Sequence, residues 1–108
     1  MALGGGLTGR PASGHRLMLF VEAPDGRYYP GSRGQVLDGG WSGKVHVGSA
    51  NGTESSYSYV ACVYDIDATF ADWLDSRSFD QLNEGLTRVP ATGSADSLAC
   101  RRLTWNRP

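Results

Sequence analysis

The stretch Tyr57–Leu74, YSYVACVYDIDATFADWL, decides the fold. Its first part, YSYVACVYDI, is rich in β-branched and aromatic residues, which is typical of a β-strand. Asp67 then stands where a helix N-cap is expected. Phe70, Trp73 and Leu74 follow at the i, i+3, i+4 spacing that gives a helix one apolar stripe. The stretch therefore predicts the strongest strand of the chain, followed directly by a short helix.

Further strand-like runs lie on both sides of this stretch. Arg16–Glu22 (RLMLFVE) is almost wholly apolar, as a strand buried on both faces is. Trp41–Gly48 (WSGKVHVG) alternates with the period of two that a half-buried strand requires. Shorter strands are expected at Arg27–Pro30 and Gln35–Leu37, and a last strand from about Ser97 to Trp105. Fifteen glycines and five prolines separate these runs, as turn residues do.

The order of these elements lacks the strand–helix alternation of a parallel sheet, so it predicts a mainly β fold with antiparallel pairing in a sandwich or partial barrel. The length of 108 residues fits one domain. Residues 1–14 are rich in glycine, and we expect them to form a flexible leader. Residues 15–108 are expected to form the single β domain, with a further helical turn near Phe79–Leu86.

Composition and charge narrow the function classes. Ten basic and eleven acidic residues give a net charge of −1, without the basic stripe that nucleic-acid binding normally leaves. Membrane insertion is not expected, because no apolar stretch approaches the roughly 20 residues that cross a bilayer. The first residues lack the apolar core of a signal peptide, so the sequence predicts no compartment.

Three strings in order, GHRLMLFVEAPDGRYYPGS, GGWSGKVHVG and SYVACVYDIDATFADWL, resemble immunoglobulin-like domains of actinobacterial proteins. The resemblance covers Leu7–Arg102. It implies an antiparallel immunoglobulin-like β-sandwich with one short helix after the strongest strand, a binding or spacer role, and no catalytic residue set. Related domains often begin with an extra strand or two, which we do not expect in this sequence. A missing first strand would leave an open sheet edge that invites a partner strand or a second copy.

Tyr28 and Tyr29 are the candidate binding residues. Alternation along a strand lets only one of two neighbouring side chains point inward, so the other is expected at the surface. Exposed tyrosines anchor protein interfaces and stack on sugar rings. The pair therefore fits either a protein partner or a carbohydrate.

The two cysteines, Cys62 and Cys100, leave two interpretations open. Alternation predicts that Cys62 shares the face of Val60 and Tyr64, and that Cys100 shares the inner face of the last strand with Leu98. Two inward cysteines form a disulfide if their Cα atoms lie within about 7 Å, and otherwise act as small buried hydrophobes. The spacing does not match a structural zinc site.

Four aspartates, Asp65, Asp67, Asp72 and Asp75, are the candidate metal ligands, because calcium favours several carboxylate oxygens. Their spacing does not match a known calcium loop. Asp67 is better explained as a helix cap, and the last two as the solvent face of the helix. We therefore expect no metal and no cofactor.

Catalytic motifs are also missing. His15 and His46 have no nearby serine or cysteine in a recognised catalytic arrangement. Gly40–Gly43 (GWSG) lacks the GxSxG spacing of a nucleophile elbow. Gly4–Gly9 lacks the lysine–serine pair of a phosphate-binding loop. The sequence thus favours a protein that is not an enzyme.

These observations lead to one main hypothesis and two alternatives. The main hypothesis is a non-catalytic interaction or assembly module that recognises a protein partner or itself through an open sheet edge. The first alternative is a carbohydrate-binding module that uses Tyr28 or Tyr29. The second is a small structural subunit of a larger particle, such as a virion.

Overall fold

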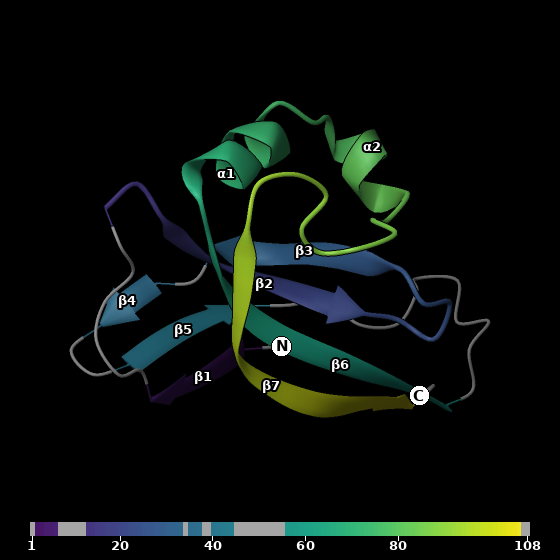
Figure 1. Cartoon of the computed structure of the whole chain (residues 1–108). Coiled ribbons are helices and arrows are strands. Elements are labelled where there is room, and N and C mark those ends of the chain that lie inside the picture. The colour runs from purple at the N-terminus through teal and green to yellow at the C-terminus, as the bar shows by residue number, and fades with distance from the viewer. Residues whose placement is uncertain (1, 7–12, 34, 38–39, 45–55, 107–108) are drawn as a thin grey trace.

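A computed structural model describes residues 2–6, 13–33, 35–37, 40–44 and 56–106 (Figure 1). The expected continuation of a strand beyond Lys44, with His46, lies outside these residues. The described elements are β1 (Ala2–Gly6), β2 (Arg16–Glu22), β3 (Tyr28–Arg33), β4 (Gln35–Leu37), β5 (Gly40–Lys44), β6 (Ser56–Ile66), α1 (Ala68–Asp75), α2 (Phe79–Asn83) and β7 (Ala95–Asn106).

The described strands form two sheets, and each pairing between these strands is antiparallel. One sheet has three strands in the order β1-β5-β4, and the other has four in the order β3-β2-β6-β7. The two helices lie over one side of the four-stranded sheet (Figure 1). The protein is therefore mainly β, as the sequence predicts, and its arrangement is consistent with a β-sandwich.

The four-stranded sheet is buried on both faces over its central strands. Along β2 and β6, alternate side chains point toward the small sheet and pack with residues from β1, β5 and β7. The members of this cluster are Leu3, Leu17, Leu19, Val21, Trp41, Tyr59, Ala61, Val63 and Leu103. The two-sided burial explains why Arg16–Glu22 is almost continuously apolar.

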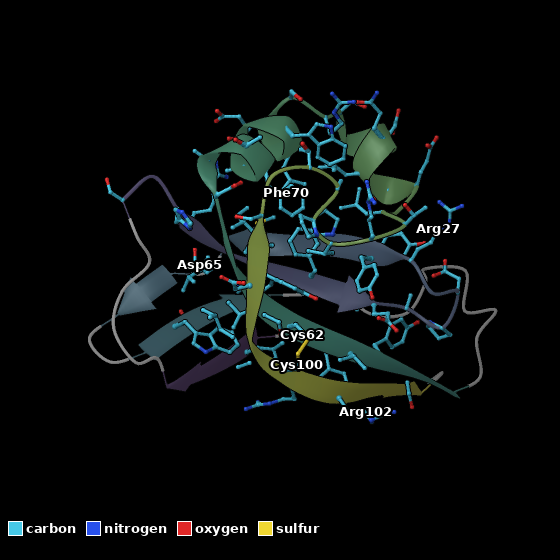
Figure 2. All side chains as sticks on the ribbon, viewed as in Figure 1. Arg27, Cys62, Asp65, Phe70, Cys100 and Arg102 are labelled. Carbon is cyan, nitrogen blue, oxygen red and sulfur yellow. A yellow bond between two sulfur atoms is a disulfide. The ribbon has the colours of Figure 1, made fainter. Side chains whose placement is uncertain are left out.

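The opposite face of the same sheet packs against the helices. Phe70 of α1 is fully buried, and its ring stacks on Phe20 of β2 with the centroids 5.7 Å apart. Figure 2 shows Phe70 between α1 and the sheet. The helix-side cluster is Met18, Phe20, Ile66, Phe70, Ala71, Leu74 and Leu86. The apolar stripe predicted for α1 thus supplies the contact that holds the helices on the sheet.

Strand β1 differs from the sequence expectation. The sequence predicts a flexible leader over residues 1–14, whereas Ala2–Gly6 pairs with β5 and Leu3 joins the core at 7% exposure. Glycine is needed in β1 because the Trp41 ring lies close to its backbone. A Cβ at Gly5 would lie 3.0 Å from Nε1 of Trp41. The glycines that suggest flexibility instead let an indole ring pack against β1. The chain therefore has a strand before Arg16 that the sequence analysis missed.

The described residues form two helices where the sequence predicts one helix and a further turn. Asp67 is the N-cap of α1, as predicted. The second helix, α2, begins with a capping box in which the Ser78 hydroxyl accepts from the Gln81 N–H and the Gln81 side chain accepts from the Ser78 N–H. A capping box explains how a helix of five residues is held at its start.

Strand β7 pairs with β6 along its whole length and carries an irregularity. Tyr64 lies opposite Ser97 and Val63 opposite Ala99, so Leu98 is an extra residue that forms a β-bulge. The sequence predicts that Leu98 and Cys100 share an inner face. This prediction is wrong, because both residues are exposed, with Leu98 at 44%. The bulge shifts the alternation, and neither layer extends over this part of the last strand.

The Asp67 carboxylate joins α1 to the start of β7. One oxygen accepts from the Phe70 N–H at 2.9 Å, and the other accepts from the Ser94 N–H at 2.9 Å and the Ser94 hydroxyl at 3.0 Å. The Phe70 hydrogen bond lowers the pKa of Asp67 below its ordinary value of 3.8 and outweighs the opposing effect of desolvation. The Ser94 bonds and the nearby His15 act in the same direction.

We predict that Asp67→Asn lowers the stability of the fold at about pH 7, because the asparagine keeps only one accepting oxygen for donors on two sides. A lowered folded-state pKa stabilises the protein above the unfolded-state pKa, and this contribution is lost as the pH falls through the folded-state pKa. The stability difference between the two proteins should therefore shrink as the pH is lowered from about 7 into the acid range. Urea unfolding across this range measures it.

Asp72→Asn is the matched control, because it removes the same charge from an exposed position of α1. It should change the urea midpoint much less than Asp67→Asn at about pH 7. A stability difference for Asp67→Asn that stayed constant down to the lowest pH would contradict the role of the ionised carboxylate.

Candidate interaction edge on strand β7

Residues Asp96–Arg102 of β7 are all exposed, and the next residue, Leu103, is buried. Successive residues of a strand point to opposite faces of the sheet. An unbroken exposed run therefore means that neither the helices nor the small sheet covers this part of the strand. We call the exposed run and the outer side of its backbone the β7 edge.

Strand β7 ends the four-stranded sheet and, among the residues that the structure describes, pairs with β6 alone. The other end of the sheet, β3, is different. Its Tyr28 N–H donates to the Leu86 carbonyl at 2.8 Å, and the Leu86 N–H donates back to the Tyr28 carbonyl at 2.7 Å. The segment after α2 thus pairs with β3 at Tyr28, whereas no described residue pairs with the outer side of β7.

A disulfide joins Cys62 of β6 to Cys100 of β7, directly across the strand pair (Figure 2). The two Cα atoms are 4.1 Å apart. So short a separation is typical of the antiparallel pairs that exchange no backbone hydrogen bonds with each other. The N–H and C=O of Cys100 therefore point away from β6, and those of Arg102, two residues on, do the same. These groups are the hydrogen-bonding part of the β7 edge.

Charged side chains line the β7 edge on both faces. Asp96 lies opposite Asp65, and Arg101 lies opposite Ala61, on the face that turns toward the small sheet. Arg101 reaches toward the Gly4 carbonyl of β1 at 3.5 Å. Arg102 points to the other face, and Figure 2 shows it at the outer part of β7.

The predicted binding residues, Tyr28 and Tyr29, lie on β3 at the far end of the sheet from β7. Tyr28 is half-buried against the helix-side cluster, and a hydrogen bond with Glu22 raises the pKa of its hydroxyl. The Tyr29 hydroxyl donates to Asp25 at 2.8 Å. Burial and this hydrogen bond raise the pKa of Tyr29.

Gly85 explains how Tyr29 is positioned. A Cβ at Gly85 would lie 2.9 Å from Cζ of the Tyr29 ring, and its φ of +82° is in the left-handed region that favours glycine. The Tyr29 ring therefore lies against the backbone that follows α2. The structure does not bring the tyrosine pair and the β7 edge together.

The four candidate aspartates have different partners and do not form one site. Asp65 pairs with Nδ1 of His15 at 2.8 Å, and Asp67 caps α1. Asp75 receives two hydrogen bonds from the Arg16 guanidinium, at 3.2 and 2.7 Å, which the solvent-face prediction did not foresee. Asp72 is exposed, as predicted. Within the described ranges, no group of three or more His, Cys, Asp or Glu side chains is placed to hold a metal ion.

The candidate functional residues on β7 were not predicted from the sequence. The available signal was the pair Arg101 and Arg102 between apolar residues of the last strand, since natural sheet edges often carry charged side chains. That signal does not reveal which strand forms the edge.

In the described part of the chain, no helix has the length and apolarity needed to cross a membrane.

We predict that reducing the Cys62–Cys100 disulfide lowers the free energy of unfolding by about 2–4 kcal/mol, because the bond limits the unfolded chain over a sequence separation of 38 residues. The exposure of Cys100 should let a reductant reach the bond while the protein is folded. Urea unfolding with and without dithiothreitol, with alkylation to count thiols, measures both effects.

The double variant Cys62→Ala and Cys100→Ala is the control for this measurement. Its urea midpoint should not respond to dithiothreitol. A native protein whose thiols are fully alkylated after reduction, yet whose midpoint is unchanged, would show that the bond does not stabilise the fold.

Comparisons with protein-family models, with curated proteins and with solved structures gave no match to this chain. The geometry of the β7 edge is therefore the feature that points to a function.

Proposed function

We propose that this protein is a non-catalytic interaction or assembly module that binds an extended protein segment, from a partner or from a second copy, along the β7 edge. The observation that carries the proposal is the exposure of every side chain from Asp96 to Arg102 on a strand whose described pairing is with β6 alone. A strand placed beside β7 would extend the four-stranded sheet. Main-chain hydrogen bonds supply affinity in this mode of recognition.

The side chains of the β7 edge add selectivity to this backbone recognition. Charged residues and a bulge are features that discourage indiscriminate edge-to-edge pairing. The edge therefore favours a partner strand whose charges are opposite to those of Asp96, Arg101 and Arg102, and it disfavours a strand with like charges at those positions. Leu98, a large hydrophobic residue that is 44% exposed, offers apolar area near the middle of the exposed run.

The immunoglobulin-like class is part of the same proposal. A constant-type immunoglobulin domain, with its strands numbered along the chain, has sheets in the orders 1-2-5-4 and 3-6-7. The sheets of this protein are β1-β5-β4 and β3-β2-β6-β7. Six strands, all except β2, are grouped into sheets as the immunoglobulin order requires, and this grouping supports the class. Strand β2 departs from it, because β2 lies between β3 and β6. The disulfide also departs, since it joins neighbouring strands of one sheet.

No observation on the described residues favours the carbohydrate-binding or virion-subunit alternative over a protein strand. Stacking on a sugar needs an open aromatic face. The Tyr29 ring packs at Gly85, and Tyr28 packs against the helix-side cluster. The proposal is therefore limited to protein segments.

We predict that Arg102→Pro abolishes strand binding while Arg102→Ala retains most of it. Both variants lose the guanidinium, but only proline removes the N–H that points away from β6. Proline is tolerated where a strand N–H faces solvent, so the fold should survive. Peptides of about twelve residues, selected by phage display against the wild-type protein, are the probe. Titration of selected peptides against both variants gives the comparison.

The two variants should have similar thermal midpoints, which excludes unfolding as the cause of lost binding. Bound peptide should also slow amide hydrogen exchange at Cys100 and Arg102. The proposal fails if no peptide is selected, or if the selected peptides bind Arg102→Pro as tightly as Arg102→Ala.

A further inference from the structure

We infer that the strand that completes the β7 edge is β7 of a second copy, in an antiparallel two-fold dimer that places Asp96 of each copy beside Arg101 of the other. This inference rests on the proposed function and names its partner. The supporting observations are the register of β7, the faces of its charged side chains and the lack of a salt bridge from Asp96 to any described residue.

The bulge puts Asp96 and Arg101 on one face of the sheet although they are five residues apart. In a regular strand, residues separated by an odd number point to opposite faces. Here Leu98 is the extra residue, so Asp96 opposite Asp65 and Arg101 opposite Ala61 both point toward the small-sheet side. An antiparallel copy therefore meets an acid and a base on the same face.

The electrostatic surroundings of Asp96 favour a cationic side chain supplied by another molecule. It lies directly opposite Asp65 in the β6–β7 pair, and like charges in that position repel. His15 pairs with Asp65, at 2.8 Å, and not with Asp96. Among the described residues, Asp96 is exposed and forms no salt bridge. An arginine supplied by a second copy would offset the repulsion.

A two-fold axis normal to the sheet, between Leu98 and Ala99, satisfies these constraints together. It brings Asp96 opposite Arg101 twice, because each copy contributes both residues. Ser97 of one copy then lies opposite Cys100 of the other, and both residues are on the helix side, facing Tyr64 and Cys62 in their own copies. Opposed residues of an antiparallel pair must share a face, and this register meets that requirement.

The same axis buries the apolar centre of the β7 edge. Leu98 of each copy lies beside Ala99 of the other, which removes the exposed leucine from water. An axis normal to the sheet keeps both helix layers on one side and both small sheets on the other. The joined sheet has the order β3-β2-β6-β7-β7-β6-β2-β3. Such a closed pairing uses up both open edges and stops at two copies.

Charge reversal tests the register. In Asp96→Arg, two arginines face each other at both contacts, and in Arg101→Asp two aspartates do. Each single variant should raise the dimer dissociation constant by about tenfold or more. The double variant Asp96→Arg with Arg101→Asp should restore dimerisation, and an equimolar mixture of the two single variants should form heterodimers. Sedimentation equilibrium over a range of protein concentrations, with native mass spectrometry of the mixture, provides the readout.

Asp72→Arg and Arg88→Asp are the matched controls, since they make the same charge changes at exposed positions outside β7. Neither should alter the dimer, and circular dichroism should show that every variant is folded. A wild-type protein that stays monomeric up to about 1 mM would overturn the inference, because that concentration corresponds to a very weak interface. A dimer that is indifferent to both single reversals would overturn it as well.

The peptide experiment separates this failure from a failure of the proposed function. A monomeric protein whose peptides are lost in Arg102→Pro and kept in Arg102→Ala still binds strands at β7, so only the second-copy partner is refuted. A monomeric protein that also selects no peptide refutes both the partner and the function.

Discussion

The antiparallel pairing of β2 with β6 is the interaction on which both layers of the protein depend. It runs from Arg16 opposite Ile66 to Glu22 opposite Val60. Each strand sends alternate side chains to the small sheet and to the helices. Neither layer has a comparable core of its own, because three short strands or two short helices bury little apolar area alone. Anything that shifts this register by one residue exchanges the two faces.

The exposure of strand β7 is a consequence of this arrangement. Strand β6 lies between β2 and β7 in the sheet, whereas the side chains of β7 from Asp96 to Arg102 are all exposed. The Cys62–Cys100 disulfide and the β6 ladder fasten β7 from its inner side. Among the described residues the outer backbone of β7 has no partner strand, an arrangement suited to adding a strand without prior ordering.

Local patterns predicted the elements whose signals are contained in a few neighbouring residues. The apolar run of β2, the β-branched composition of β6, and the cap and stripe of α1 were all recognised because they are properties of short windows. Strand β1 was missed because its signal is contradictory. Glycine-rich sequence reads as flexible chain, yet at Gly5 the absence of a side chain makes room for Trp41. That role is visible only once the two segments are paired.

The sequence by itself determined a mainly β chain, its strongest strands, the helix that follows Asp67, and two cysteines on different strands. Tertiary structure alone decided that Cys62 and Cys100 face each other, that β7 is an edge, and that Asp96 and Arg101 share a face. The physical reason is that periodicity fixes how a strand alternates but not which strand lies beside it. A single bulged residue, Leu98, then reverses that alternation, and only the pairing partner reveals it.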